Sequence, residues 1–147
     1  MKKKKGVILV KKISFIVKDK SFEKFMMMTI LGTTGSAMDI EMNFFFTFWG
    51  LYLLKKKFKP KVAGMPFPMK GMGAKIFTKR LKKTGIENPW ELIKEAVAEG
   101  KMKLYPCTTT MDLMGIKRED MFDFVEEPIG AAGFLEICDN ADGIVSL

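Results

Sequence analysis

The stretch that decides the fold is Met102-Lys-Leu-Tyr-Pro-Cys107-Thr-Thr-Thr-Met-Asp-Leu-Met-Gly-Ile116. Residues 102–105 are typical of a short strand, and Pro106 turns the chain into one or two helical turns over 108–114. Gly115 is typical of a helix end. A strand that leads directly into a helix is the repeating unit of a parallel α/β sheet. Cys107 is therefore predicted at a junction between strand and helix.

The remainder of the chain repeats this alternation. Strands are predicted over 12–17 and 39–47 and at 144–145, and the proline-rich stretch over 60–68 is predicted to be a loop with at most a short strand around Val62. A helix capped by Ser21 is predicted to loosen at Gly32 and Gly35, and Asn88-Pro89 predicts the start of another. Further helices are predicted over 49–57, 70–84, 108–114, 117–124 and 130–140. The pattern predicts a single α/β domain with a mainly parallel sheet.

Helical spacing predicts which side chains face the core. In the helix after Ser21 these are Phe22, Phe25, Met26, Thr29 and Ile30. In the helix over 70–84 they are Met72, Ile76, Phe77 and Leu81.

The 147 residues suit one domain, predicted over 12–147, with residues 1–11 as a flexible basic leader. Six of the eight net positive charges come from lysines in the first twelve residues. The charges divide into a basic front half and an acidic back half, which could form complementary surfaces within or between subunits, although solvated faces are the favoured interpretation. Aromatic residues do not interleave with the lysines, so no nucleic-acid partner is predicted.

Composition excludes several kinds of chemistry. The chain has no histidine and only two cysteines, which are far apart, so neither a zinc site nor a histidine-based triad is predicted. The glycines at 32–35 and 71–75 match neither a phosphate loop nor a dinucleotide loop, and no cofactor is predicted. The longest apolar run, 44–54, is too short to span a bilayer. A cytoplasmic location with free thiols is expected.

Cys107 is the leading candidate for chemistry. A thiol at the start of a helix faces N–H groups that favour the thiolate, and Thr108, Thr109 and Thr110 add hydroxyl donors. Lys117 and Arg118 would add positive charge if the turn folds back. The competing interpretation is a buried, inert cysteine.

Two further candidates are less distinctive. Asp112 is a base, an orienting group or a surface carboxylate. Cys138, in a helical pattern, is favoured as a packing residue, and it would act as a second thiol only if the two sulfurs meet in space.

Three segments together resemble the DsrE/DsrF-like family, in particular its larger branch of single-domain proteins. They are Phe45-Phe46-Thr47-Phe48-Trp49-Gly50-Leu51, Met65-Pro66-Phe67-Pro68-Met69 with Met72-Gly73-Ala74, and Cys107 with Met111-Asp112-Leu113-Met114-Gly115-Ile116. The resemblance implies a flavodoxin-like three-layer sandwich with a mainly parallel sheet, assembled as a homo-oligomer. It also implies sulfur relay through a persulfide on Cys107.

The resemblance extends to the surroundings of the cysteine. It implies supporting roles for Thr108, Thr109, Thr110, Asp112 and Gly115. A pocket or an interface is expected at Phe48, Trp49, Met65 and Met69. The family often has methionine and serine where this chain has the three threonines, and Cys138 lies outside its motif.

The leading function is an intracellular sulfur carrier or persulfide-forming sulfurtransferase subunit. Its partners would be sulfur donor and acceptor proteins, rhodanese-like or small sulfur carriers, or a small thiol. The alternatives are a non-catalytic oligomeric assembly module, in which Cys107 only packs, and, less favoured, a peripheral membrane-associated redox accessory protein.

Overall fold

The structure, a computed structural model, describes residues 10–66 and 68–147. Most of the predicted leader lies outside these residues, as does Phe67. In chain order the elements are β1 (Lys12–Val17), α1 (Phe22–Ala37), β2 (Glu41–Phe46), the 3-10 helix η1 (Phe48–Leu54), α2 (Lys70–Lys83), α3 (Pro89–Ala98), β3 (Met102–Pro106), α4 (Thr108–Met114), the 3-10 helix η2 (Arg118–Asp120), α5 (Ala131–Ile137) and β4 (Gly143–Ser146).

The four strands form one parallel sheet in the order β3-β2-β1-β4. This confirms the predicted parallel sheet. Because the strands are parallel, their carboxyl ends lie along one edge. Backbone hydrogen bonds tie that edge together: Cys107 N donates to Phe46 O at 2.9 Å, and Thr47 N donates to Val17 O at 3.0 Å. The segments that follow β2 and β3 therefore begin side by side.

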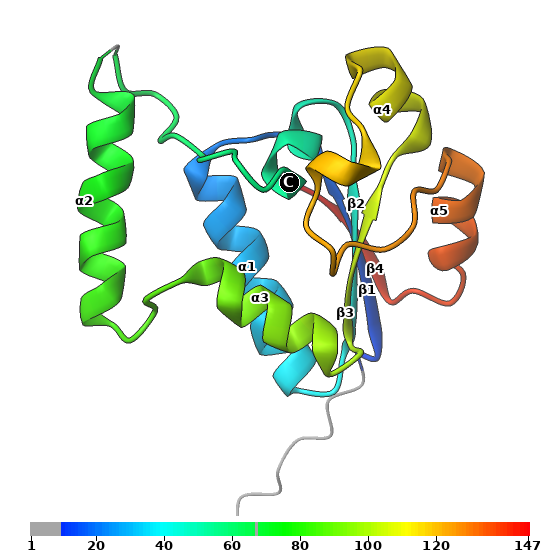
Figure 1. Ribbon diagram of the computed structural model, residues 1–147. Helices are drawn as coiled ribbons and strands as arrows, with labels where there is room; N and C mark the ends of the chain where they lie inside the picture. The colour runs from blue at the N-terminus through cyan, green and yellow to red at the C-terminus, as the bar shows by residue number, and fades with distance from the viewer. Residues whose placement is uncertain (1–9, 67) are drawn as a thin grey trace, which may run out of the picture.

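Helices cover both faces of the sheet, which confirms the three-layer α/β architecture. Figure 1 shows α1 and α3 on one face and α5 on the other, with α4 above the carboxyl ends of the strands. Alternate side chains of β2 point to opposite faces, so Phe44 and Phe46 join the large core while Phe45 joins a smaller cluster. In the same view α2 stands beyond α1, away from the sheet.

Helix α1 begins as predicted but ends later. The Ser21 hydroxyl accepts a hydrogen bond from Lys24 N at 3.4 Å, which caps the first turn. Gly32 and Gly35 do not loosen the helix, which continues to Ala37. A Cβ on Gly32 would lie 2.6 Å from Met102 Cε, and one on Gly35 would lie 2.4 Å from Met42 Sδ. These glycines let α1 pack closely on the sheet.

Some predicted burial is wrong, and in each case the position of the helix is the reason. Ile30 is 50% exposed, whereas Met28, on the face of α1 that packs against the sheet, is fully buried. Met72, Ile76 and Phe77 are also exposed, because α2 does not pack on the sheet.

Two predicted helices are shorter and tighter than expected. The segment after β2 forms the 3-10 helix η1 rather than an α-helix. Residues 117–124 contain only the single turn η2. Near Val62, Lys61 forms an isolated bridge with Ser21 in place of a strand.

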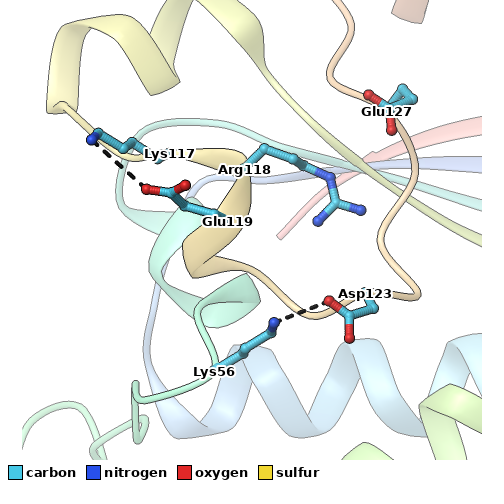
Figure 2. Close-up of a pocket in the computed structure, with 6 residues that line it drawn as sticks. All are labelled: Lys56, Lys117, Arg118, Glu119, Asp123 and Glu127. Atoms are coloured by element: carbon cyan, nitrogen blue, oxygen red, sulfur yellow. Dashed lines mark hydrogen bonds and ion pairs between the residues drawn. The ribbon is translucent and has the colours of Figure 1, made fainter.

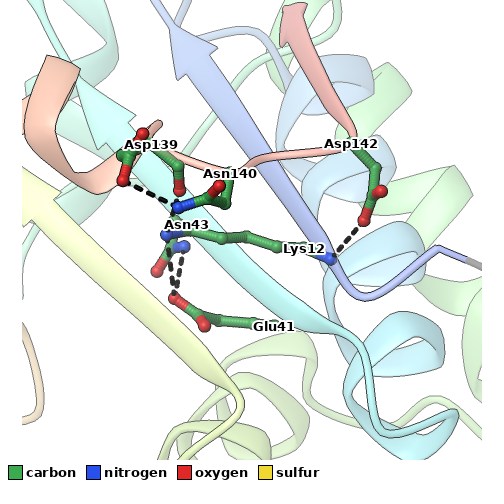
Figure 3. A network of polar contacts seen from close by, with 6 residues as sticks. All are labelled: Lys12, Glu41, Asn43, Asp139, Asn140 and Asp142. Atoms are coloured by element: carbon green, nitrogen blue, oxygen red, sulfur yellow. Dashed lines mark hydrogen bonds and ion pairs between the residues drawn. The ribbon is translucent and has the colours of Figure 1, made fainter.

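The amino ends of the strands carry a polar network, shown in Figure 3. The Asp142 carboxylate accepts the N–H groups of Lys11 and Lys12 at 2.6 and 2.9 Å, and these bonds hold the pKa of Asp142 below its usual value. Lys12 Nζ donates to Asp139 O at 3.0 Å. Asn43 Nδ2 donates to Glu41 Oε1 at 2.8 Å. The network fastens β4 to β1 at the edge opposite Cys107.

Among residues 10–66 and 68–147, no helix has both the length and the apolar composition needed to cross a bilayer.

Candidate functional site

Cys107 lies where the sequence predicts it, between the end of β3 and the start of α4. Its N–H group is bonded to β2, and the next N–H, from Thr108, donates to Ile129 O at 2.9 Å. Ile129 N donates in turn to Pro106 O at 3.0 Å, so the cysteine is fixed on both sides by backbone hydrogen bonds. Its side chain caps none of the N–H groups of α4. The thiol is therefore held in place without being committed to a cap.

The Cys107 side chain is only 6% exposed and lies in an apolar cluster with Phe45 and Phe134. The two rings stack at a centroid distance of 4.5 Å. Phe45 comes from the carboxyl end of β2, as its penultimate residue, and Phe134 comes from α5. Neither was predicted as a site residue, although the alternation of β2 already places Phe45 on the face opposite Phe44. Together they shield the thiol from water.

Cys138 belongs to the same cluster. It ends α5, one helical turn after Phe134, and its N–H group donates to Phe134 O at 3.0 Å. Both cysteines are free, and Cys138 is half-buried. The fold thus gathers the two thiols around one pair of aromatic rings, although they are far apart in the sequence.

The three threonines after Cys107 differ in their surroundings. Thr110 is buried, and its hydroxyl lies 2.9 Å from that of Thr47 at the end of β2. Thr108 is half-buried and Thr109 is exposed. The Thr110 hydroxyl is therefore already occupied in joining α4 to β2, which leaves Thr108 and Thr109 available. Thr47 was missed because only the strand order places it beside α4.

Asp112 is exposed on α4, where a surface carboxylate needs no partner. Gly115 ends the helix with a φ of +62°, a left-handed conformation that glycine adopts without strain. Its contribution to the site is thus to turn the chain after α4. This turn brings in the segment that carries Lys117 and Arg118.

Lys117 and Arg118 direct their charges into their own loop rather than toward the thiol. Lys117 Nζ lies 3.7 Å from Glu119 Oε1, and Arg118 donates to the carbonyl oxygens of Phe122 and Val125. An open cleft of about 690 Å³ lies beside these residues. Figure 2 shows Lys117, Arg118 and Glu119 on one side of it and the ion pair between Lys56 and Asp123, at 3.0 Å, on the other. The two cations therefore stabilise the loop over 118–125.

Two large aromatic side chains remain exposed directly after β2. Phe48 is 55% exposed and Trp49 is 56% exposed. Phe48 has a φ of +46°, a conformation that costs a non-glycine residue about 1–3 kcal/mol. Gly50 follows because a Cβ there would lie 2.1 Å from Val17 O. The backbone is thus bent so that two aromatic rings face solvent near the carboxyl edge of the sheet.

Met65 and Met69 are not brought to Cys107. Met69 precedes the first residue of α2, and Met65 packs against Gly73 within that helix. Figure 1 shows α2 on the far side of α1 from α4. The aromatic and methionine segments are therefore separate surfaces in the monomer.

Tyr105 lies on β3 and packs against the cysteine cluster. Burial, followed by the charges of Glu126 and Glu41, raises the pKa of its phenol to about 12. The side chain is therefore neutral over the physiological range. The thiol consequently has an uncharged, largely apolar wall on the α5 face of the sheet.

Comparison with known proteins places this arrangement in a family. The family model described as DsrE/DsrF/DrsH-like matches residues 10–68 and 61–144. A sulfur carrier protein, DsrE2 of Allochromatium vinosum, is 33% identical over 134 residues, which cover 77% of this chain and 83% of that protein. The uncharacterised protein YrkE of Bacillus subtilis is 29% identical, with 93% of this chain and 96% of that protein covered.

Solved structures show the same fold at low sequence identity. The ychN protein of E. coli superposes with a TM-score of 0.58 and 15% identity, over 94% of this chain and all of that one. MTH1491 of Methanobacterium thermoautotrophicum, a protein of unknown function, superposes with a TM-score of 0.55 and 11% identity, over 92% and 98%. These likenesses support the α/β fold.

Proposed function

This chain belongs to the DsrE/DsrF/DrsH-like family, and on that premise we propose that it carries sulfur as a persulfide on Cys107. Its similarity to a sulfur carrier protein supports a role in sulfur relay. The observation that carries the finer proposal is the position of Cys107, held by backbone hydrogen bonds at the carboxyl edge of a parallel sheet. Sites in such sheets form at that edge.

The proposed reaction is two successive thiol exchanges. The Cys107 thiolate attacks the outer sulfur of a donor persulfide, R–S–SH, and forms Cys107–S–SH while the donor leaves as the thiolate R–S⁻. An acceptor thiolate then attacks the outer sulfur of Cys107–S–SH and regenerates the Cys107 thiolate. Sulfur is transferred without net oxidation or reduction, so neither step needs a cofactor.

The surroundings of Cys107 suit storage between these two steps. The stacked rings of Phe45 and Phe134 and the neutral Tyr105 slow the access of water and small thiols to the persulfide. Thr108 and Thr109 offer hydroxyl donors to the outer sulfur, because neither is engaged as Thr110 is. A chain without histidine can perform this chemistry, since no proton relay is required.

Because Cys107 is buried, we expect a partner protein to accelerate transfer, whereas free polysulfide reaches the thiol slowly, when α5 moves aside. A donor or acceptor, rhodanese-like or a small sulfur carrier, would dock on the exposed rings of Phe48 and Trp49 and open the cover formed by α5. We place the reaction in the cytoplasm, where thiols stay reduced, and expect the protein to act as a homo-oligomer.

The second candidate function is a binding or assembly module without sulfur chemistry. The exposed aromatic pair after β2 favours it, because solvent-facing rings held in a strained backbone are suited to a protein contact. In that case Cys107 would be a packing residue only.

Intact mass after exposure to polysulfide tests the proposal. The natural protein is compared with Cys107→Ser and with the matched control Cys138→Ser. The proposal expects a gain of sulfur, removed by reductant, in the natural protein and in Cys138→Ser but not in Cys107→Ser. A gain that survives in Cys107→Ser, or no gain in any of the three, would sink it and favour the binding module.

A further inference from the structure

A second cavity lies away from Cys107, between α2 and the layer formed by α1 and α3. Its volume is about 760 Å³, within the range of roughly 300–1,000 Å³ that is typical of small-molecule sites. Five separate segments line it, namely the start of α1, the loop over 56–61, α2, the start of α3 with the residues just before it, and Phe122 after η2. Its aromatic lining residues are Phe22, Phe25, Phe58, Trp90 and Phe122.

Trp90 is the centre of this aromatic wall. Its ring lies 4.9 Å from that of Phe25 and 4.5 Å from that of Phe122, in tilted arrangements. Ala74 on α2 contributes a small apolar side chain to the opposite wall. Because the rings already pack against one another, the wall favours a flexible apolar chain over a flat ring that would need a free face.

Lysines surround the apolar wall. Those that line the cavity, apart from Lys56, are Lys57, Lys59, Lys61, Lys75, Lys79 and Lys82. Within the described residues none of these six has a carboxylate oxygen within 4.0 Å. Glu87 is the one acidic side chain among the described residues that line the cavity.

Three lysines of α2 lie on the side of the helix that faces this cavity. Lys75, Lys79 and Lys82 are spaced by four and three residues, so they lie along one face of the helix, and all three line the cavity. These lysines are exposed, so water solvates their ammonium groups in the empty protein, and no carboxylate among the described residues competes with a ligand for them. An anionic head group in contact with an apolar chain would satisfy both features.

We infer that this cavity binds a single-chain anionic amphiphile of the fatty acid class. The chain would lie along Phe25, Trp90 and Phe122, and the carboxylate would lie among the lysines of α2 and of the loop over 56–61. Charge complementarity with the lysines favours an anion. The volume of about 760 Å³ accommodates a single hydrocarbon chain but not the surface of a bilayer. This site is separate from Cys107 and does not depend on sulfur chemistry.

Trp90 is the reporter for a direct test. Because Trp49 is the only other tryptophan, the Trp49→Phe variant leaves Trp90 as the single source of indole fluorescence. The three probes are decanoate, 1-decanol as the uncharged chain, and acetate as the head group without the chain. We expect a saturable change with decanoate, binding of 1-decanol at least about tenfold weaker, and no change with acetate.

Lysine variants decide whether the anion is recognised at this cavity. Replacing three lysines that line it should weaken decanoate binding about tenfold, in the variant Lys75→Gln, Lys79→Gln, Lys82→Gln. The matched control removes the same charge elsewhere, Lys18→Gln, Lys94→Gln, Lys103→Gln, and should bind within about twofold of the parent. Equal weakening by both triple variants, equal binding of 1-decanol and decanoate, or a response that never saturates would each overturn the proposal.

Discussion

The two faces of the sheet differ in how deeply they are covered. On one face, α1 and α3 bury a continuous core in which Phe44, Phe46, Met102 and Leu104 are wholly inaccessible. On the other, the seven-residue helix α5 covers a small cluster centred on Phe45. The face covered by α1 and α3, called the thick face below, supplies most of the hydrophobic stabilisation, and the face covered by α5 is called the thin face. The thin face holds both cysteines, where a modest displacement of α5 would expose them.

Consecutive residues of β2 offer the sharpest test of this difference. Phe44→Ala should cost about 3–5 kcal/mol of unfolding free energy, because the cavity that it leaves is enclosed on the thick face. Phe45→Ala should cost less, because α5 can settle into the space. Chemical denaturation of both variants measures the difference. Equal losses would contradict the contrast between the faces.

Phe44→Ala and Phe45→Ala should also differ in the reactivity of Cys107, and here Phe45→Ala should have the larger effect. Phe45→Ala removes one of the rings that shield Cys107 and should accelerate its alkylation several-fold, whereas a native-like Phe44→Ala protein should not. The rate is measured in a Cys138→Ser background so that one thiol is observed. An unchanged rate in Phe45→Ala would mean that the ring does not control access.

Glycine-to-alanine substitutions in the covering helices should have opposite signs. Gly32→Ala places a methyl group 2.6 Å from Met102 Cε and 3.1 Å from Phe44, so we expect a loss of about 1–3 kcal/mol. Gly133→Ala in α5 meets Ile129 Cβ at an ordinary 3.4 Å, so helix propensity should stabilise the protein by up to about 1 kcal/mol. Thermal unfolding compares the two, and stabilisation by Gly32→Ala would refute the close approach of α1.

The pKa of Tyr105 tests how dry the thin face is. Because the pKa of its phenol is raised to about 12, its stabilising contribution is complete below pH 10 and is lost as the pH rises from about 10 toward 12. In Tyr52→Phe, Tyr105 is the only tyrosine, and its ionisation can be followed by ultraviolet absorbance. Ionisation near pH 10 in the folded protein would show that water reaches the cluster.

The smallest expected effect on stability concerns Asp142, at the amino ends of the strands. Asp142 has a lowered pKa because its carboxylate accepts two backbone N–H groups, so its stabilisation is present above about pH 4 and is lost as the pH falls below that value. Asp142→Asn should therefore lower stability at neutral pH and flatten the acid side of the profile. Denaturation midpoints between pH 2 and 7 measure this, and an unchanged profile would contradict it.

Much of the fold could be predicted because local patterns and packing agree. The strands, the caps at Ser21 and Asn88, and the junction at Cys107 follow from propensity and periodicity. The prediction failed where a helix does not face the sheet: α2 has an amphipathic pattern, yet its apolar residues Met72 and Ile76 are exposed. The predicted loosening of α1 at Gly32 and Gly35 is wrong because glycine occurs both where helices end and where a helix packs closely against a sheet, and the sequence does not distinguish the two.

The candidate site likewise has features that could be predicted from the sequence and others that could not. The sequence by itself determined the thiol, its place between a strand and a helix, and the absence of histidine, because these depend on residue identity and local order. Only the tertiary structure decided which side chains surround Cys107. Phe45, Phe134, Cys138 and Thr47 come from distant segments, and strand order and helix placement, which no local pattern encodes, bring them together.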